Sequence, residues 1–221
     1  MPPLDYFAPF TYFFKDKNWP WKFILASLLT YTLVGAAPVL GWLLVIVRRV
    51  GQWQEPEVPE LTDWKNFWKQ GGKFAGVNAL WLLPVLLAVI LLYLPLIFAH
   101  AIQPDMTLAV FGVILACVLV FLLVYSIVYA FFFPAMQVLL ARGCSPWQSA
   151  DPLRLWKTVR AHFSRYLLVY LIVGLALFNF MLVAAALTAF VLLPPLLVYA
   201  GLVSAHYAGQ LERLDRQGEL C

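Results

Sequence analysis

The chain has 221 residues, of which 63% are hydrophobic and 12% charged, and its formal net charge is +4. Soluble domains hold roughly 45 to 50% apolar residues, so this composition excludes an ordinary soluble protein and indicates an integral membrane protein. The positive charge does not indicate a nucleic-acid partner, because the cations flank apolar blocks and alternate with Trp, as is typical beside lipid headgroups. We expect the bilayer, with its anionic headgroups, to be the partner of these cations.

The distribution of Lys and Arg predicts the membrane orientation. All of them fall into four clusters, at residues 15–22, 48–73, 142–165 and 213–216. Between the clusters lie three apolar blocks without Lys or Arg, at residues 23–47, 74–141 and 166–211. Because cytoplasmic loops carry the excess of positive charge, we expect a multi-pass protein of a prokaryotic inner (cytoplasmic) membrane with both termini in the cytoplasm.

The first apolar block, residues 23–47, has two interpretations. As one straight helix it would reach about 37 Å, enough for a single tilted span. However, the sequence GAAP, from Gly35 to Pro38, lies at its centre and leaves two arms that fit a re-entrant hairpin reaching half-way into the bilayer. The charge rule favours the hairpin, since a single span would place the first cation cluster outside.

The second and third blocks are each long enough for two spans. In the second block we expect spans at Phe74–Phe98 and Leu108–Phe133, joined by an outer turn at 100–107 (HAIQPDMT). In the third block we expect spans at about 166–186 and 190–209, joined near Thr188. The predicted fold is therefore an all-α integral membrane protein made of helical hairpins, with four full spans plus the re-entrant hairpin or single span at 23–47.

Cationic, aromatic segments precede these blocks and carry helix signals of their own. Asp151 and Pro152 predict an N-cap and a first helical position, after which apolar residues recur at helical spacing at Leu153, Trp156, Val159 and Phe163. We predict amphipathic interfacial helices on the cytoplasmic side, lying in the membrane surface. Their candidate surface for lipids or a partner consists of Trp64, Lys65, Trp68, Lys69, Lys73, Trp156, Lys157, Arg160 and Arg165.

These segments also resemble each other. At an offset of 92 residues, Trp64 matches Trp156 and Lys65 matches Lys157, and a weaker match at an offset of 51 sets Lys22 beneath Lys73. The chain therefore reads as three copies of one plan, a cationic aromatic segment followed by an apolar block. We predict a single membrane domain over 1–221, with internal units at approximately 1–52, 53–143 and 144–221.

Three stretches in the first third of the chain resemble a known family. They are FTYFFKDKNW at 10–19, LGWLLVIVRRV at 40–50 and PELTDWKNFWKQGGKF at 59–74. Together they resemble the prokaryotic multi-pass membrane family catalogued as domain of unknown function 4013. In that family a Gly-aromatic pair precedes a twin Arg and a Trp opens the second unit; these places are filled here by Gly41-Trp42, Arg48-Arg49 and Trp64. The resemblance implies no catalytic or binding residue, since the family has none assigned.

The sequence offers few groups for chemistry. His100 and Asp105 share the predicted outer turn without a third ligand, so we expect no metal site. His206, near the inner end of the last predicted span, is a weak candidate for an axial haem or pigment ligand, and we expect no cofactor. We expect Asn78 and Asn179 to hydrogen-bond to neighbouring helices. The cysteines, in a reducing compartment, are expected to form no disulfide.

The predicted spans contain no Asp, Glu, Lys or Arg, so a catalytic role is disfavoured. We expect a non-catalytic membrane protein: a scaffold or accessory subunit of a membrane protein complex, in one version also shaping the cytoplasmic leaflet. Other membrane protein subunits, or further copies of the chain, would be its protein partners. The alternative is a small transporter or channel, because repeated helical hairpins and proline-interrupted spans are features that transporters use.

Overall fold

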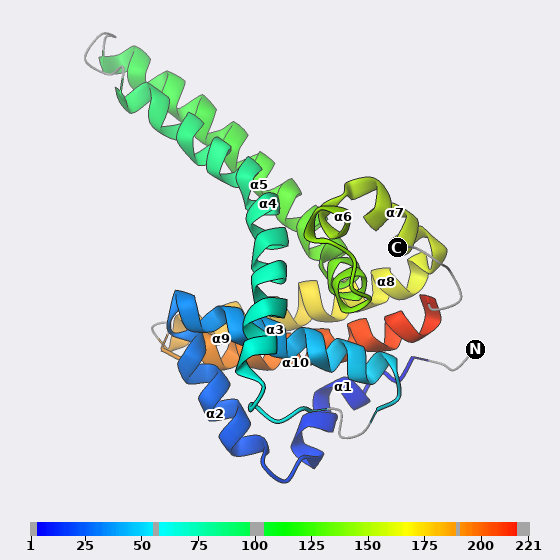
Figure 1. The fold of residues 1–221 in the computed structure, drawn as a ribbon. Helices are drawn as coiled ribbons and strands as arrows, with labels where there is room; N and C mark the ends of the chain where they lie inside the picture. Colours follow the sequence, from blue (N-terminus) through cyan, green and yellow to red (C-terminus); the bar gives the residue numbers. More distant parts are fainter. Residues whose placement is uncertain (1–3, 55–57, 98–103, 189–190, 216–221) are drawn as a thin grey trace. The chain divides into compact units, whose positions relative to one another are not determined.

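The computed structural model describes residues 4–54, 58–97, 104–188 and 191–215, and all regular structure within them is helical (Figure 1). The chain forms two compact units. The larger unit comprises Met1–Val77 and Phe131–Cys221, and the smaller unit comprises Asn78–Ala130. The all-α prediction is therefore confirmed for the described residues.

The N-terminal part of the larger unit holds four short to medium helices. They are α1 (Ala8–Thr11), the 3₁₀ turn η1 (Tyr12–Lys15), α2 (Trp19–Thr30) and α3 (Leu33–Gly51). The helical structure is interrupted between α2 and α3, at Tyr31 and Thr32. The Thr32 hydroxyl caps α3 by accepting a hydrogen bond from Gly35 N at 2.9 Å. A threonine N-cap satisfies an orphan amide of the first turn and so defines the start of a helix.

The predicted interruption at Gly35 to Pro38 is therefore wrong. Pro38 lies inside α3, close to its N-terminal end, and the helix continues through it. Pro38 is the sixth residue of α3, past the amides that lack an intrahelical acceptor, so the helix continues through it with one backbone hydrogen bond fewer. The two arms of this block are consequently unequal, with 12 residues in α2 and 19 in α3.

Two long helices follow, α4 (Trp64–Ile97) and α5 (Pro104–Ala141). The segment 64–73 is the beginning of α4 and not a separate interfacial helix, because no helix-breaking proline separates it from the apolar stretch that follows. The predicted outer turn at 100–107 is too long at its C-terminal end, since α5 begins at Pro104, a residue favoured at the first helical position. Residues 98–103, which include His100, lie outside the described residues.

The last third contains α6 (Pro146–Ala150), α7 (Pro152–Ala161), α8 (Phe163–Val169), the π-helical segment η3 (Tyr170–Leu177), α9 (Phe178–Leu187) and α10 (Leu193–Asp215). The predicted N-cap is confirmed, because the Asp151 carboxylate accepts a hydrogen bond from Leu153 N at 3.0 Å. The predicted turn near Thr188 is also confirmed, since α9 ends at Leu187 and α10 begins at Leu193.

Four stretches of the described residues are long and apolar enough to cross a membrane, namely Val34–Gly51, Trp64–Tyr93, Val110–Ala141 and Phe163–Met181. The predicted span at 190–209 is not among them. Its helix, α10, carries buried polar side chains in its second half, which lowers its mean hydropathy; these are Ser204, His206, Gln210 and Glu212. Part of α10 thus behaves as a core helix of the larger unit.

The core of the larger unit forms where α3 packs along α10. Trp42 of α3 is fully buried, and its Nε1 donates a hydrogen bond to Pro59 O at 3.1 Å. The N-terminal segment also packs on α10: Tyr12 donates to Leu202 O at 3.2 Å and Tyr207 donates to Tyr6 O at 2.7 Å. The segment from Tyr6 to Tyr12 is therefore attached to α10.

Asp5 lies at the start of the N-terminal segment that packs on α10. Its carboxylate accepts hydrogen bonds from Ala8 N at 2.9 Å and Phe7 N at 3.0 Å, and these two bonds hold the pKa of Asp5 below its usual range. Its backbone bonds to Gln210 in both directions, with Asp5 N donating to Gln210 Oε1 at 3.0 Å and Gln210 Nε2 donating to Asp5 O at 3.1 Å. The side chain thus organises the first turn while the backbone attaches it to α10.

The crossing of α3 and the first turns of α4 depends on two glycines. A Cβ added to Gly41 would lie 1.9 Å from Phe67 O, and one added to Gly71 would lie 1.7 Å from Ala37 O. Both distances are far shorter than any van der Waals contact, so the two backbones touch only because neither residue has a side chain. Small residues allow this close approach between membrane helices.

The smaller unit holds the apolar parts of α4 and α5. Tyr129 donates a hydrogen bond to Asn78 Oδ1, and Tyr125 donates to Trp81 O. The expectation that Asn78 bonds to a neighbouring helix is therefore confirmed. Beyond this cluster the unit exposes large aliphatic side chains, among them Leu82, Leu86, Leu87, Ile90, Val113, Val120 and Leu123.

Asn179 behaves differently from the expectation. Its side chain is exposed and its Nδ2 donates to Leu175 O, four residues earlier, at 2.5 Å; it makes no bond to a neighbouring helix within the part of the chain that the structure describes. The acceptor, Leu175 O, belongs to the π-helical segment η3, which ends two residues before Asn179 at Leu177. Where a π-helix passes into an α-helix the backbone pairing shifts, and a short amide side chain can then serve a nearby carbonyl.

Candidate functional site

Three helices of the larger unit end close to one another. They are α3, which ends at Gly51, α5, which ends at Ala141, and α10, which ends at Asp215. The last carbonyls of a helix have no intrahelical donor and carry a partial negative charge, so cations are favoured there. Each of these three ends coincides with one of the cationic clusters of the sequence.

Each helix end receives an arginine from a different helix. Arg48 of α3 donates from Nε to Ala141 O of α5 at 3.0 Å, and Arg142, directly after α5, donates from Nη2 to Glu212 O of α10 at 3.4 Å. Arg213 of α10 donates from Nε to Val50 O of α3. The bonds thus run from α3 to α5, from α5 to α10 and from α10 back to α3. We call Arg48, Arg142 and Arg213 the arginine cycle.

Glu212 is the acidic group of this region, and it is only 5% exposed. Arg142 lies beside it, with Nε 4.0 Å from Oε1. Gly51 leaves room for the carboxylate, since a Cβ on that glycine would lie 1.8 Å from Glu212 Oε2. The arginine therefore serves both the end of α10 and a buried carboxylate.

Arg213 has a second contact, with Trp53. Its guanidinium carbon lies 3.5 Å from the centroid of the Trp53 ring, a distance typical of a cation–π interaction. Trp53 has a φ of 58°, in the left-handed region that costs a non-glycine residue about 1 kcal/mol or more. The contact with Arg213 thus involves the residue at which the chain turns after α3.

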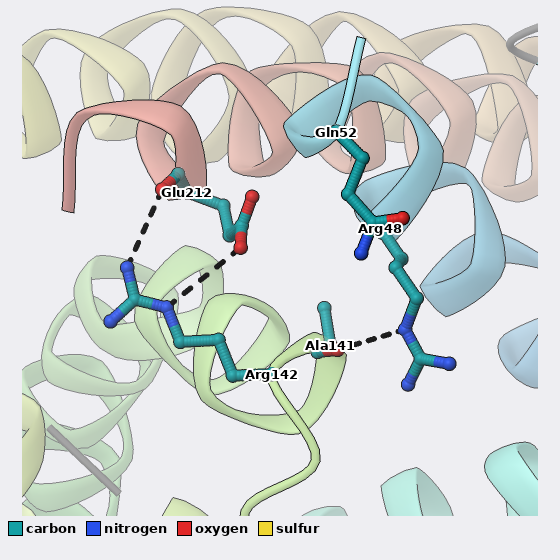
Figure 2. A pocket seen from close by; sticks show the side chains of 5 residues that line it. All are labelled: Arg48, Gln52, Ala141, Arg142 and Glu212. Carbon is teal, nitrogen blue, oxygen red and sulfur yellow. Dashed lines mark hydrogen bonds and ion pairs between the residues drawn. The ribbon is translucent and has the colours of Figure 1, made fainter. Parts of the chain in front are cut away.

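An open pocket of about 620 Å³ lies beside the arginine cycle, entirely within the larger unit. It is lined by Arg48, Gln52, Ala141, Arg142 and Glu212. Figure 2 shows Arg48 and Gln52 on one side of the pocket, and Arg142 with Glu212 on the other. The lining is thus polar, and it contains two cations and one anion.

The predicted lipid or partner surface falls into two groups of side chains. On α4, Lys65, Trp68 and Lys69 are exposed, and Trp64 and Lys73 are half-buried. On α7 and α8, Trp156, Lys157 and Arg160 are exposed, and Arg165 is half-buried. No hydrogen bond or ring contact joins the two groups in the part of the chain that the structure describes. The predicted apolar side of α7 is divided, because Val159 is fully buried while Leu153 is 73% exposed.

One predicted headgroup cation is instead part of the core. Lys22 is 2% exposed, and its Nζ lies 2.7 Å from Asp16 Oδ2 and 2.9 Å from Glu60 Oε1. It also donates to Val58 O at 3.4 Å. The first cation cluster therefore stabilises the fold with at least one of its members.

We expect the substitution Lys22→Met to lower the free energy of unfolding by about 2 kcal/mol. The two carboxylates lose a shared partner, but their own exposure of 13% and 60% lets water replace part of that interaction. Lys17→Met, at an exposed position of the same cluster, is the control and should stay within about 0.5 kcal/mol of the wild type. Denaturant unfolding in a mild detergent measures both. Equal effects would show that Lys22 is not a structural cation.

His206, the weak cofactor candidate, is buried where the N-terminal segment packs on α10. It is 3% exposed, its Nδ1 lies 3.1 Å from Gln210 Nε2, and its ring centroid lies 4.4 Å from that of Tyr12. This environment fits a core histidine that supports this packing. Among the described residues there is no group of three or more His, Cys, Asp or Glu side chains that could hold a metal ion.

The cysteines differ from the expectation in one respect. Cys144, at the start of the α6 region, is disulfide-bonded, so the prediction of no disulfide is wrong. Cys221 lies outside the described residues. Cys117 is free and exposed on α5.

The comparison with known protein families decides the identity of the chain. The family model described as "Protein of unknown function (DUF4013)" matches residues 24–205. The chain belongs to this family. No curated protein and no solved structure matches it.

The structure gives physical roles to the DUF4013 motif positions named above. Gly41 allows the close crossing with Gly71, Trp42 fills the core and binds Pro59 O, and Arg48 caps α5. Gln52, Arg142, Glu212 and Arg213 were not identified from the sequence. For the two arginines, the sequence did offer a signal: they stand at the ends of apolar blocks, and cations that cap helix C-termini occupy such positions.

Proposed function

We propose that this DUF4013 protein is a non-catalytic integral membrane protein that acts as a scaffold or accessory subunit of a membrane protein complex. In this proposal it resides in the prokaryotic inner membrane with both termini in the cytoplasm, as the distribution of its cations suggests. Its binding surface is formed by the apolar parts of α4 and α5 in the smaller unit, through which it contacts other subunits or copies of itself.

The observation that carries this proposal is the apolar exterior of the smaller unit. Its most apolar windows, in the candidate spans of α4 and α5, are only 17% and 6% buried inside the chain. Tyr129 and Asn78, two polar residues of the smaller unit, are hydrogen-bonded to each other and so do not mark a substrate path. A helix pair that is apolar all round needs lipid or another protein to cover it.

The length of α5 adds support for the leaflet-shaping version of the proposal. Its part in the smaller unit, from Pro104 to Ala130, would span about 40 Å at roughly 1.5 Å per residue, against a hydrocarbon core of about 30 Å. Such a mismatch is relieved by tilt or by local thickening of the bilayer. The exposed cations on α4 and α7 would in addition attract anionic headgroups, by about 1 kcal/mol each near the surface.

Crosslinking through Cys117 tests whether the α5 surface contacts another protein. In a variant whose sole cysteine is Cys117, oxidation in native membranes is expected to give a crosslinked dimer if copies pair, and a bis-maleimide is expected to trap a partner that offers a nearby thiol. The matched control moves the thiol along the same helix to Val138, a fully buried position, through Val138→Cys and Cys117→Ser. This control should not crosslink.

A negative result in two assays would refute the proposal. If the Cys117 variant gives no crosslink, and the protein purified in mild detergent is a monomer without bound subunits that leaves liposome shape unchanged, neither the scaffold version nor the leaflet-shaping version survives. Wild-type expression level and the native lipid composition should be kept in the crosslinking experiment, because a weak membrane contact depends on both.

A small transporter or channel is the second candidate, favoured by the π-helical segment η3. This segment lies inside the candidate span Phe163–Met181, and π-helical turns are frequent at functional sites. Flux of ions or small solutes into proteoliposomes tests this function. A measured flux that is lost in Asn179→Leu, which removes the hydrogen bond to Leu175 O, would favour transport over the scaffold.

A further inference from the structure

We propose that the pocket beside the arginine cycle is a binding site for one phosphate group, as a monoester or a diester. The proposal goes beyond a scaffold role, which requires no anion site, and it does not depend on that role. It rests on unpaired donors that line the pocket, on the charge balance of its walls and on its place at the ends of two candidate spans.

The donors come from α3. Arg48 is fixed by its Nε bond to Ala141 O, and its Nη1 and Nη2 have no hydrogen-bond partner among the described residues. The side-chain amide of Gln52, in the next turn of the chain, likewise has none there, and both side chains line the pocket. A guanidinium anchored through one nitrogen presents its remaining N–H groups in a fixed planar arrangement, which suits the oxygens of a phosphate.

The charge balance of the walls limits what the pocket accepts. Arg48 and Arg142 contribute two positive charges, and Glu212 contributes one negative charge, so the lining carries a net charge of +1. The nearby end of α5 is already capped by Arg48, which offsets its partial negative charge. A phosphodiester, with one negative charge, would neutralise the net charge of +1. The buried Glu212 carboxylate repels every anion that enters the pocket.

The position of the pocket supplies the argument for a ligand of this chemistry. Arg48 lies in the last turn of the candidate span Val34–Gly51, and Arg142 directly follows the candidate span Val110–Ala141. The ends of spans lie at the depth of the headgroups, where lipid phosphates are abundant. Trp53 nearby is 67% exposed, and exposed Trp is typical of that depth.

Native mass spectrometry and equilibrium titration of the full-length protein in a nonionic detergent test the site. The probes are phosphatidylglycerol, which carries a phosphodiester, and inorganic phosphate. The wild type is expected to bind one equivalent of at least one probe. Arg48→Gln is expected to weaken that binding at least about tenfold, because the ligand loses a charge-assisted pair of hydrogen bonds. Lys69→Gln, at an exposed cation of α4 away from the pocket, should leave it unchanged.

Two further variants keep the test decisive if Arg48→Gln fails to fold. Gln52→Ala lies outside the arginine cycle and is expected to weaken binding about two- to fivefold, whereas Glu212→Gln removes the opposing charge and is expected to strengthen it several-fold. Opposite shifts in these variants identify the pocket as the site. Binding of phosphatidylglycerol alone makes the ligand a lipid headgroup, and binding of both probes makes it a phosphate of either source. Equal binding by wild type, Gln52→Ala and Glu212→Gln would overturn the proposal.

Discussion

Replacing Gly71 with alanine is expected to lower the free energy of unfolding by about 2 to 4 kcal/mol. The added Cβ would lie 1.7 Å from Ala37 O, an atom of the opposing backbone, which cannot rotate away as a side chain can. Helices α3 and α4 would have to separate at their crossing, and the contacts around Gly41 and Phe67 would be lost with them. Overpacking of a tight core typically costs about 1 to 3 kcal/mol, and a clash with a rigid backbone lies at the upper end.

The neighbouring residue provides a matched control for this substitution. Gly72 occupies the same helix turn, and a Cβ added there meets no atom within 4 Å. Gly72→Ala should therefore be neutral or stabilise the protein by up to about 1 kcal/mol, since alanine is the better helix former. Thermal or denaturant unfolding in detergent compares the two variants. If both behaved alike, the close crossing of α3 and α4 would be wrong.

The substitution Arg142→Met is expected to destabilise the protein by about 2 to 3 kcal/mol. It deprives the Glu212 carboxylate, which is 5% exposed, of its neighbouring guanidinium and removes the hydrogen bond to Glu212 O. Breaking a buried pair from one side is expensive because the remaining charge stays desolvated. The 4.0 Å separation and the partial exposure of Arg142 keep the expected loss below the upper end of the range for such pairs.

A double-mutant cycle separates the charge effect from a general loss of packing. Glu212→Gln alone should cost less than Arg142→Met, and adding it to Arg142→Met should recover part of the loss, since no buried charge is then left. Arg154→Met is the control for an exposed pair, because Arg154 lies 3.8 Å from Asp151 with both side chains about 40% exposed. It should change stability by less than about 1 kcal/mol. Strict additivity of the Arg142 and Glu212 substitutions would contradict the proposed pairing.

Local signals in the sequence were sufficient for part of this fold. The N-cap at Asp151 and the turn between α9 and α10 follow from residues adjacent in the chain, and the structure has both. The break in the first apolar block was misplaced because GAAP looked like the stronger interruption, whereas the capping hydroxyl of Thr32 determines where α3 starts. Pro38 costs α3 one backbone hydrogen bond but does not end the helix, whereas the N-cap at Thr32 defines where it begins.

The candidate site could not be predicted from the sequence, for a different reason. The sequence shows arginines at the ends of apolar blocks, and such arginines were interpreted as markers of orientation and as headgroup contacts. Which helix end each arginine caps depends on tertiary contacts between residues that are 70 to 163 positions apart. Likewise, the burial of Lys22 depends on Glu60, which no local pattern connects to it. The sequence therefore located the charged groups correctly and left their partners open.

The arginine cycle also bears on the order in which the chain is made. Its three bonds join residues 93, 70 and 163 positions apart, and the last of them needs Arg213. During synthesis the ends of α3 and α5 can meet first, but the end of α3 receives its arginine only after α10 has been made. The arginine cycle therefore closes only after α10 is in place, whatever contacts α3 and α5 have already made.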